Sequence, residues 1–230
     1  FWYTPGLLAW LRRIAPLADR HVANAAAIAA RIRTTLRIDP DRIEVLPNGM
    51  DLEPFRALPA RAEARACFGL DPSAPIAGLL ANLNRPVKRP DLFIEAAAII
   101  AVRHPDARFA ILGDGSLRPD LEARARALGI ADRLSFLGQR PTSREFVAAV
   151  DIGVCPSDSE GLSNAILELE AAGVPMVATR TGGNPEIVIE GETGILVEPG
   201  SACDLAGAVS RLLDDPALAR RLGAAARAMV

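Results

Sequence analysis

Residues 75–102 read PIAGLLANLNRPVKRPDLFIEAAAIIAV, and this stretch decides the fold. It begins with an unbroken apolar run at residues 76–81, continues through a basic segment with two asparagines, and ends in a helical pattern over residues 90–102. A short run that is apolar throughout is typical of a parallel strand, because helices cover both faces of a parallel sheet. The stretch therefore predicts the first strand, loop and helix of a βαβ unit.

The same alternation continues downstream. We expect further strands at residues 108–112, 134–137, 152–155, 176–178 and 194–197, with helices between them at 117–128, 144–150, 163–172 and 185–189. Alternating strands and helices predict a doubly wound, Rossmann-like α/β fold with a parallel sheet. In such sheets ligands bind beyond the carboxyl ends of the strands, so the loops that follow the strands are the candidate functional segments.

The upstream part has a different pattern. Helical stretches at 7–18 and 25–36 flank a short apolar run at 21–23, and a strand is expected at 42–46 before the turn Pro47-Asn48-Gly49. We place a boundary here, with residues 1–38 as the end of a truncated preceding domain and residues 39–230 as one complete α/β domain. The length of 230 residues corresponds to about one and a half domains, and we expect a piece of a longer protein.

Composition excludes several classes of protein. Half of the residues are hydrophobic and 23% are charged, which excludes a disordered chain. A net charge of −2 argues against a nucleic-acid partner. Three widely spaced cysteines without a CxxC pair, Cys67, Cys155 and Cys203, indicate neither a disulfide framework nor a zinc site, so we expect a cytoplasmic protein. No apolar run reaches the roughly 18 residues of a membrane span.

The loop after the expected strand at 152–155 carries two carboxylates. Glu160 lies in the loop and Glu168 lies in the helix that follows, with the helix N-terminus between them. Free N–H groups at such an N-terminus form a site for a diphosphate, and Gly161 would let backbone approach it closely. A carboxylate in a solvated loop followed by an ordinary helical glutamate has the same spacing, so both interpretations stay open.

Two other loops contain anion-binding chemistry. Arg85, Lys88 and Arg89 place three cations within five residues after the strand at 76–81, and Lys88 is the single lysine of the chain. This arrangement suits a phosphate clamp, although a solvated basic loop fits equally. Gly182 and Gly183 open a helix and could present backbone N–H groups to an anion, or form a plain turn. No metal-binding or Ser-His-Asp cluster is evident.

Taken together, these motifs resemble the C-terminal domain of family-4 retaining glycosyltransferases of the GT-B fold. The family pattern of two glutamates separated by seven residues matches EGLSNAILE at 160–168, and its GGxPE segment matches GGNPE at 182–186. Further matches are PNGMD at 47–51, LGDG at 112–115, FLG at 136–138 and GETGILV at 191–197. The matches run in order from about residue 36 to residue 199.

The resemblance implies a role for each motif. Glu168 would bind the ribose hydroxyls of a nucleotide-sugar donor, and Glu160 would lie near the donor hexose. Arg85 and Lys88 would neutralise the diphosphate leaving group without a metal or other cofactor. The backbone of Gly161-Leu162-Ser163 would complete the cradle around the phosphates. The segment Gly138-Gln139-Arg140 would border the base. The sequence departs from the family in the spacing of Arg85 and Lys88, which is three residues instead of about five, and in Leu162-Ser163, where an aromatic-proline pair is common.

The function implied by the resemblance is transfer of a hexose from a nucleotide-diphosphate sugar to a sugar or lipid-linked acceptor with retention. The acceptor would be bound by the missing domain, and peripheral contact with the inner face of a membrane is compatible with a lipid-linked acceptor. Two alternatives stay open. The chain alone could bind nucleotide without turnover, or the protein could be a nucleotide-sugar epimerase on the same fold.

Overall fold

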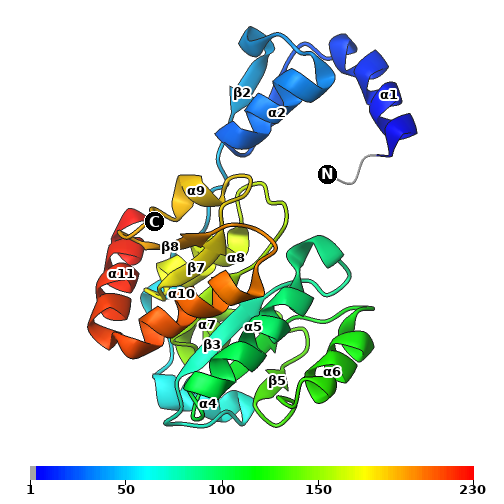
Figure 1. Cartoon of the computed structure of the whole chain (residues 1–230). Coiled ribbons are helices and arrows are strands. Elements are labelled where there is room, and N and C mark those ends of the chain that lie inside the picture. Colours follow the sequence, from blue (N-terminus) through cyan, green and yellow to red (C-terminus); the bar gives the residue numbers. More distant parts are fainter. Residues whose placement is uncertain (1–3) are drawn as a thin grey trace.

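The computed structural model of the chain describes residues 4–230, which form two α/β units of unequal size (Figure 1). Residues 1–3, which belong to the expected preceding-domain segment, lie outside the described residues. Within the described residues, no helix combines the length and apolar character that a membrane span requires.

The small unit is built on two strands. Strand β1 (His21–Ala23) pairs in parallel with β2 (Ile43–Val45), and the connection between them contains α2 (Ala26–Leu36) and the 3₁₀ turn η2 (Pro40–Arg42). Helix α1 (Pro5–Ile14) and η1 (Ala15–Leu17) precede β1. The strand expected at 42–46 therefore forms, but it pairs with β1 and not with the large sheet. The boundary between residues 38 and 39 stays a prediction. Strand β2 follows that boundary in the sequence but belongs to the small unit.

The large unit contains a six-stranded parallel sheet in the order β5-β4-β3-β6-β7-β8. Its strands are β3 (Ile76–Leu80), β4 (Arg108–Leu112), β5 (Leu134–Phe136), β6 (Ile152–Cys155), β7 (Met176–Thr179) and β8 (Gly194–Val197). All six lie at the positions expected from the apolar runs. The expected doubly wound fold is confirmed, and its strand order reverses between β3 and β6.

Helices cover both faces of this sheet (Figure 1). The helices of the large unit are α3 (Glu53–Arg56), α4 (Arg61–Phe68), α5 (Pro90–Arg103), α6 (Arg118–Ala127), α7 (Arg144–Ala149), α8 (Asn164–Ala171), α9 (Asn184–Ile187), α10 (Ala202–Asp214) and α11 (Pro216–Met229), with η3 (Pro86–Lys88) before α5. Successive residues of a strand point to opposite faces. On β4, Phe109 and Ile111 accordingly join the core beneath α5 and α10, whereas Ala110 and Leu112 join the core beneath α7 and α8.

The reversal of strand order brings two loops together. The loop after β3 and the loop after β6 both leave the carboxyl edge of the sheet, where β3 and β6 are neighbours. The backbone N–H of Asp158 donates to the carbonyl of Val87 at 2.9 Å, which ties the two loops to each other. Loops that carry candidate site residues thus meet at the position where open α/β sheets bind ligands.

Candidate functional site

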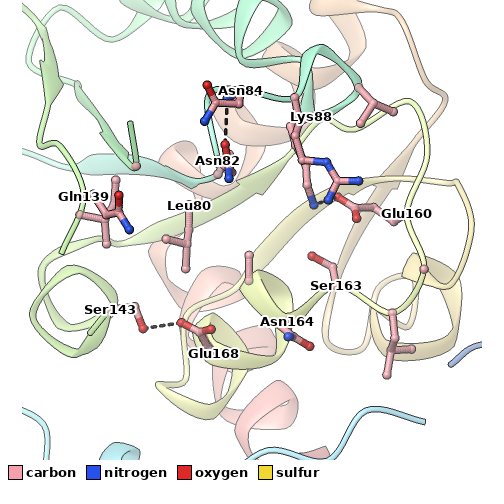
Figure 2. A pocket seen from close by; sticks show the side chains of 18 of the residues that line it. Leu80, Asn82, Asn84, Lys88, Gln139, Ser143, Glu160, Ser163, Asn164 and Glu168 are labelled. Atoms are coloured by element: carbon pink, nitrogen blue, oxygen red, sulfur yellow. Dashed lines mark hydrogen bonds and ion pairs between the residues drawn. The ribbon is translucent and has the colours of Figure 1, made fainter. Parts of the chain in front are cut away.

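A cavity of about 690 Å³ lies at this carboxyl edge (Figure 2). The loops after β3, β5 and β6 and the first part of α8 contribute most of its wall, and two residues of the small unit, Asn24 and Ile28, complete it. The expected site residues that line it are Arg85, Lys88, Gln139, Arg140, Glu160, Gly161, Leu162, Ser163 and Glu168. The structure therefore brings together segments that are up to about 80 residues apart in the large unit.

Lys88 and Glu160 form a largely buried ion pair in the cavity wall. Glu160 is 9% exposed, and its Oε1 accepts hydrogen bonds from Lys88 Nζ at 2.6 Å and from Ser157 Oγ at 2.6 Å. The same oxygen lies 3.8 Å from Cys155 Sγ. Burial raises the pKa of the Cys155 thiol, and the neighbouring Glu160 carboxylate raises it further. The lysine charge is thus held at the cavity wall by a fixed carboxylate.

The loop after β3, which carries Arg85 and Lys88, is held in place by hydrogen bonds to the loop after β4. Asn84 Oδ1 accepts from the backbone N–H of Ser116 at 2.8 Å, and the N–H of Leu83 donates to the carbonyl of Asp114 at 3.0 Å. Arg85 follows directly and lines the cavity together with Lys88. The three-residue spacing between the two cations therefore still allows both to reach one cavity.

Ser163 lies between the two carboxylates, at the N-terminus of α8 (Figure 2). Its side chain makes no capping hydrogen bond, and its Oγ is buried without a hydrogen-bond partner among the residues that the structure describes. A buried hydroxyl without a partner is costly. Together with the free N–H groups and positive end of the helix, it creates a site suited to an anionic group that enters the cavity.

Glu168 lies one to two turns further along α8. Its Oε2 accepts a hydrogen bond from Ser143 Oγ, and both side chains line the cavity (Figure 2). Gln139 and Arg140 border the same end, where the Arg140 guanidinium lies 5.4 Å from the centre of the Phe68 ring. A carboxylate held by a hydroxyl at a cavity wall can accept hydrogen bonds from two neighbouring ligand hydroxyls.

Gly138 does not line the cavity, but its backbone conformation directs the segment that does. It adopts a positive φ of 70° and forms an antiparallel bridge with Gly113, whose N–H donates to the Gly138 carbonyl at 2.9 Å. This bridge fixes the direction in which the segment enters the cavity wall at Gln139. Gly138 acts on the site through that neighbouring residue.

Gly182 and Gly183 also lie outside the cavity, beneath the Glu160 loop. A Cβ on Gly182 would lie 1.8 Å from the carbonyl oxygen of Glu160, and the N–H of Gly183 donates to the Gly161 carbonyl at 3.0 Å. The interpretation that these glycines present their N–H groups to an anion therefore needs correction for Gly183, because a neighbouring loop already accepts from that N–H. Both glycines permit two loops to pack closely.

Three asparagines at the site were missed by reasoning from the sequence. Asn48 Nδ2 donates to Asn164 Oδ1 at 2.7 Å and to the Leu162 carbonyl at 3.1 Å, and Asn48 Oδ1 accepts from Asn24 Nδ2 at 3.2 Å. Asn24 and Asn164 line the cavity. Asn48 and Asn164 lie in the quoted segments PNGMD and EGLSNAILE, but neither motif indicates what these side chains contact.

Comparison with family models gives two matches that follow one another along the chain. The model of glycosyl transferases group 1 matches residues 74–215, and the model of glycosyltransferase family 4 matches residues 2–54. The first match covers the six-stranded sheet and most of its helices, including every loop that lines the cavity within the large unit.

Curated relatives agree with the family models. The D-inositol 3-phosphate glycosyltransferase of Nocardia farcinica is 37% identical over 221 residues, which are 92% of this chain and 49% of that protein. The protein of the same name from Acidothermus cellulolyticus is 38% identical over 228 residues, again 92% of this chain and 50% of that protein. The chain thus spans about half the length of the curated relatives it matches.

Solved structures show the same fold. Sucrose-phosphate synthase from Thermosynechococcus elongatus superposes with a TM-score of 0.86 at 27% identity, over 99% of this chain and 57% of that one. HepE from Anabaena, solved in complex with UDP-glucose, superposes with a TM-score of 0.91 at 24% identity, over 99% of this chain and 63% of that one. At such identity the second likeness establishes the fold alone.

Proposed function

The chain belongs to the group 1 glycosyltransferases of family 4, and from this membership we propose that it is the donor-binding part of a hexosyltransferase. The donor is a nucleotide-diphosphate sugar, the acceptor is a sugar or lipid-linked molecule, and the anomeric configuration of the hexose is retained. The activity of the whole protein is part of the proposal, because the chain spans about half of its curated relatives.

One observation carries the proposal above all others. The buried Ser163 hydroxyl, with no partner among the described residues, lies at the N-terminus of α8 in the cavity that Arg85 and Lys88 also line. A diphosphate would accept hydrogen bonds from the hydroxyl and from the helix N–H groups, and the two cations would balance its charge. The carboxylates of Glu160 and Glu168 flank this position, where sugar hydroxyls on either side of a diphosphate would need acceptors.

The donor would lie along α8 in a fixed direction. Glu168, oriented by Ser143, accepts hydrogen bonds from the ribose hydroxyls, and the base lies against the segment Gly138-Gln139-Arg140. The backbone of Gly161-Leu162-Ser163 completes the cradle around the phosphates. The hexose then lies beside Glu160, at the end of the cavity where Asn24 of the small unit contributes to the wall.

The chemical step breaks the bond between the hexose C1 and the diphosphate oxygen, on which negative charge develops. A new bond forms between C1 and the acceptor hydroxyl oxygen, and the acceptor proton passes to the departing diphosphate. Preorganised cations and N–H groups stabilise such charge more in the transition state than in the bound donor. Lys88 is suited to this task because its ion pair with Glu160 already holds it at the cavity wall. In our proposal Lys88, Arg85 and the start of α8 suffice for the leaving group, and neither a metal nor another cofactor takes part.

Known complexes support the class of donor. HepE is solved with UDP and with UDP-glucose, and its fold covers 99% of this chain. We further propose a cytoplasmic site of action, supported by the three free cysteines. A lipid-linked acceptor would bring the protein to the inner face of a membrane.

Binding without turnover is a second candidate for these 230 residues alone. It is favoured by the coverage of about half of the curated relatives. Incubation of the chain with UDP-glucose and a panel of acceptors, including inositol phosphate as the curated relatives' names suggest, distinguishes the two. Transfer or donor hydrolysis by the chain would refute binding without turnover.

Isothermal titration calorimetry with UDP, GDP and ADP tests the proposed function directly. We expect one of the three to bind with micromolar affinity, and the affinity to be unchanged by EDTA. Circular dichroism of the same sample establishes that it is folded. Failure of a folded sample to bind any of the three would refute the proposed function, and loss of binding in EDTA would refute the part that excludes a metal.

A further inference from the structure

Helix α2 of the small unit begins without a cap of its own. The residue before it is Ala25, which has no side chain that could accept a hydrogen bond, and its first turn contains no acidic residue. The first N–H groups of a helix need acceptors, and a side-chain acceptor there typically stabilises the helix by about 1 kcal/mol. The sequence of α2 therefore leaves its N-terminus dependent on another part of the molecule.

Glu186 of the large unit supplies these acceptors. Its Oε2 accepts from the N–H of Ala26 at 2.9 Å, and its Oε1 accepts from the N–H of Ala27 at 2.9 Å. The carboxylate also lies at the positive end of the α2 dipole, which favours its negative charge. Figure 1 shows α9, the helix that carries Glu186, at the end of the large unit that faces the small unit. One side chain thus joins the two units at two points.

The helix that carries Glu186 is connected in turn to Glu160. Asn184 Nδ2 donates to the Thr179 carbonyl at 3.0 Å, Thr179 Oγ1 donates to the Ser157 carbonyl at 2.6 Å, and Ser157 Oγ donates to Glu160. Asn184, Thr179 and Ser157 are all buried. These bonds fix α9 relative to the carboxylate at the hexose end of the cavity.

The segment that Glu186 holds forms part of the same end of the cavity. Asn24, two residues before α2, lines the cavity and packs so closely on Gly161 that a Cβ there would lie 2.7 Å from Asn24 Oδ1. Ile28, in the first turn of α2, lines the cavity as well. Displacement of α2 would therefore alter the wall beside Glu160 and leave the region around Glu168 in place.

We propose that Glu186 is a positioning residue that seats α2 against the hexose end of the donor cavity and so determines how tightly the hexose is held. The inference rests on the proposed function for the identity of the ligand, but the contact itself is independent of any ligand. Glu186 touches no part of the donor and acts through Asn24 and Ile28.

The test compares Glu186→Ala and Glu186→Gln with the control Glu192→Ala, an exposed glutamate for which the described residues offer no partner. Amide hydrogen exchange at Ala26 and Ala27, measured by NMR, reports the contact. Calorimetry with the nucleoside diphosphate that binds most tightly among UDP, GDP and ADP, and with its glucose conjugate, reports the hexose separately from the rest of the donor.

For Glu186→Ala we expect exchange at Ala26 and Ala27 to be at least about five-fold faster, the factor that loss of a typical cap implies. Affinity for the glucose conjugate falls by a similar factor, and affinity for the diphosphate changes by less than about two-fold. Glu186→Gln, which retains one acceptor oxygen, gives intermediate values, and Glu192→Ala matches the wild type.

Unchanged exchange at Ala26 and Ala27 would overturn the inference, and so would an equal loss of affinity for both ligands, which would indicate general damage to the donor site. If the wild type binds none of the diphosphates, the proposed function fails and the effect on hexose binding fails with it. Exchange at Ala26 and Ala27 then still decides whether Glu186 holds α2.

Discussion

Lys88 Nζ lies 2.6 Å from Glu160 Oε1, although the two residues are 72 positions apart in the sequence. Lys88 ends the η3 turn after β3, and Glu160 lies in the loop after β6. The pair joins the two loops at the point where the strand order reverses, and it places the single lysine of the chain in the cavity wall. The positive charge is thereby available to a ligand while the carboxylate remains paired.

Loss of the Lys88 charge should affect stability and binding in different ways. Lys88→Met leaves the buried Glu160 carboxylate without its cation, and we expect a loss of about 3 kcal/mol of unfolding free energy. The double variant Lys88→Met/Glu160→Gln should recover most of that loss, because no buried charge remains, yet bind diphosphate as weakly as Lys88→Met. Urea unfolding and calorimetry measure the two effects.

The exposed ion pair between Arg103 and Asp214 provides the control for the stability measurements on Lys88→Met and Lys88→Met/Glu160→Gln. Its side chains are 66% and 50% exposed, so Arg103→Ala should change stability by less than about 0.5 kcal/mol. A double variant that is less stable than Lys88→Met would contradict the assignment of the cost to an unpaired Glu160.

Removal of the Glu168 carboxylate should weaken nucleotide binding. If Glu168 binds the ribose as proposed, Glu168→Ala leaves the ribose hydroxyls without acceptors, and we expect a loss of more than about 1 kcal/mol of binding free energy for the tightest of UDP, GDP and ADP. Ser143→Ala should give a smaller loss, because Ser143 orients Glu168 without replacing it. Calorimetry measures both. Glu63→Ala, on an exposed position of α4, is the control, and an unchanged dissociation constant for Glu168→Ala would exclude the ribose assignment.

Gly182 should tolerate no side chain. Its φ of 52° is unfavourable for alanine, and the added Cβ would meet the Glu160 carbonyl oxygen at 1.8 Å. We expect Gly182→Ala to lower the unfolding free energy by about 3 kcal/mol through strain and overpacking together. Gly191→Ala separates the two causes, since Gly191 has a φ of 74° with open space around it and should cost only about 1 kcal/mol. Equal losses in urea unfolding would show that the close approach to Glu160 is unimportant.

Glu170 should make the protein less stable as pH rises. The side chain is fully buried in α8, neither oxygen has a partner among the described residues, and burial raises the pKa of the carboxyl to about 8. The folded state therefore retains a proton that the unfolded state loses above its ordinary pKa of 4.5. The unfolding free energy falls as pH rises from about 4.5 through 8, by roughly 5 kcal/mol in all.

Glu170→Gln removes this ionisation. We expect the variant and the wild type to have similar unfolding free energies near pH 5, and the variant to be increasingly the more stable of the two towards pH 9. Chemical denaturation across this range measures the difference, with Glu192→Gln at an exposed position as the control. Parallel pH profiles for Glu170→Gln and the wild type would show that Glu170 does not carry the dependence.

The large sheet was predictable because each of its strands and helices has a recognisable pattern of apolar residues in the local sequence. Each apolar run expected between residues 76 and 197 forms a strand of the large sheet, and most of the expected site residues line one cavity. The partner of β2 was not predictable in this way. Three residues, Ile43–Val45, carry no pattern that distinguishes pairing with β1 from joining the six-stranded sheet.

The glycine pair shows a second limit. Gly182-Gly183 before a helix indicates a backbone that approaches something closely, and the sequence favoured an anion as much as a plain turn. The structure places the Glu160 and Gly161 carbonyls there instead. The local sequence indicates that another group can approach the backbone of this turn closely. Which group does so depends on the position of the neighbouring loop.

By itself the sequence determined the alternation of strands and helices, the doubly wound fold and the order of motifs that resembles family-4 glycosyltransferases. These features depend on periodicity and turn chemistry within about ten residues. Only the tertiary structure decided that Lys88 pairs with Glu160, that Asn48 joins Asn24 to Asn164, and that Glu186 caps α2 across 160 residues. Such contacts depend on strand order and on how the two units meet, and no local pattern in the chain encodes either.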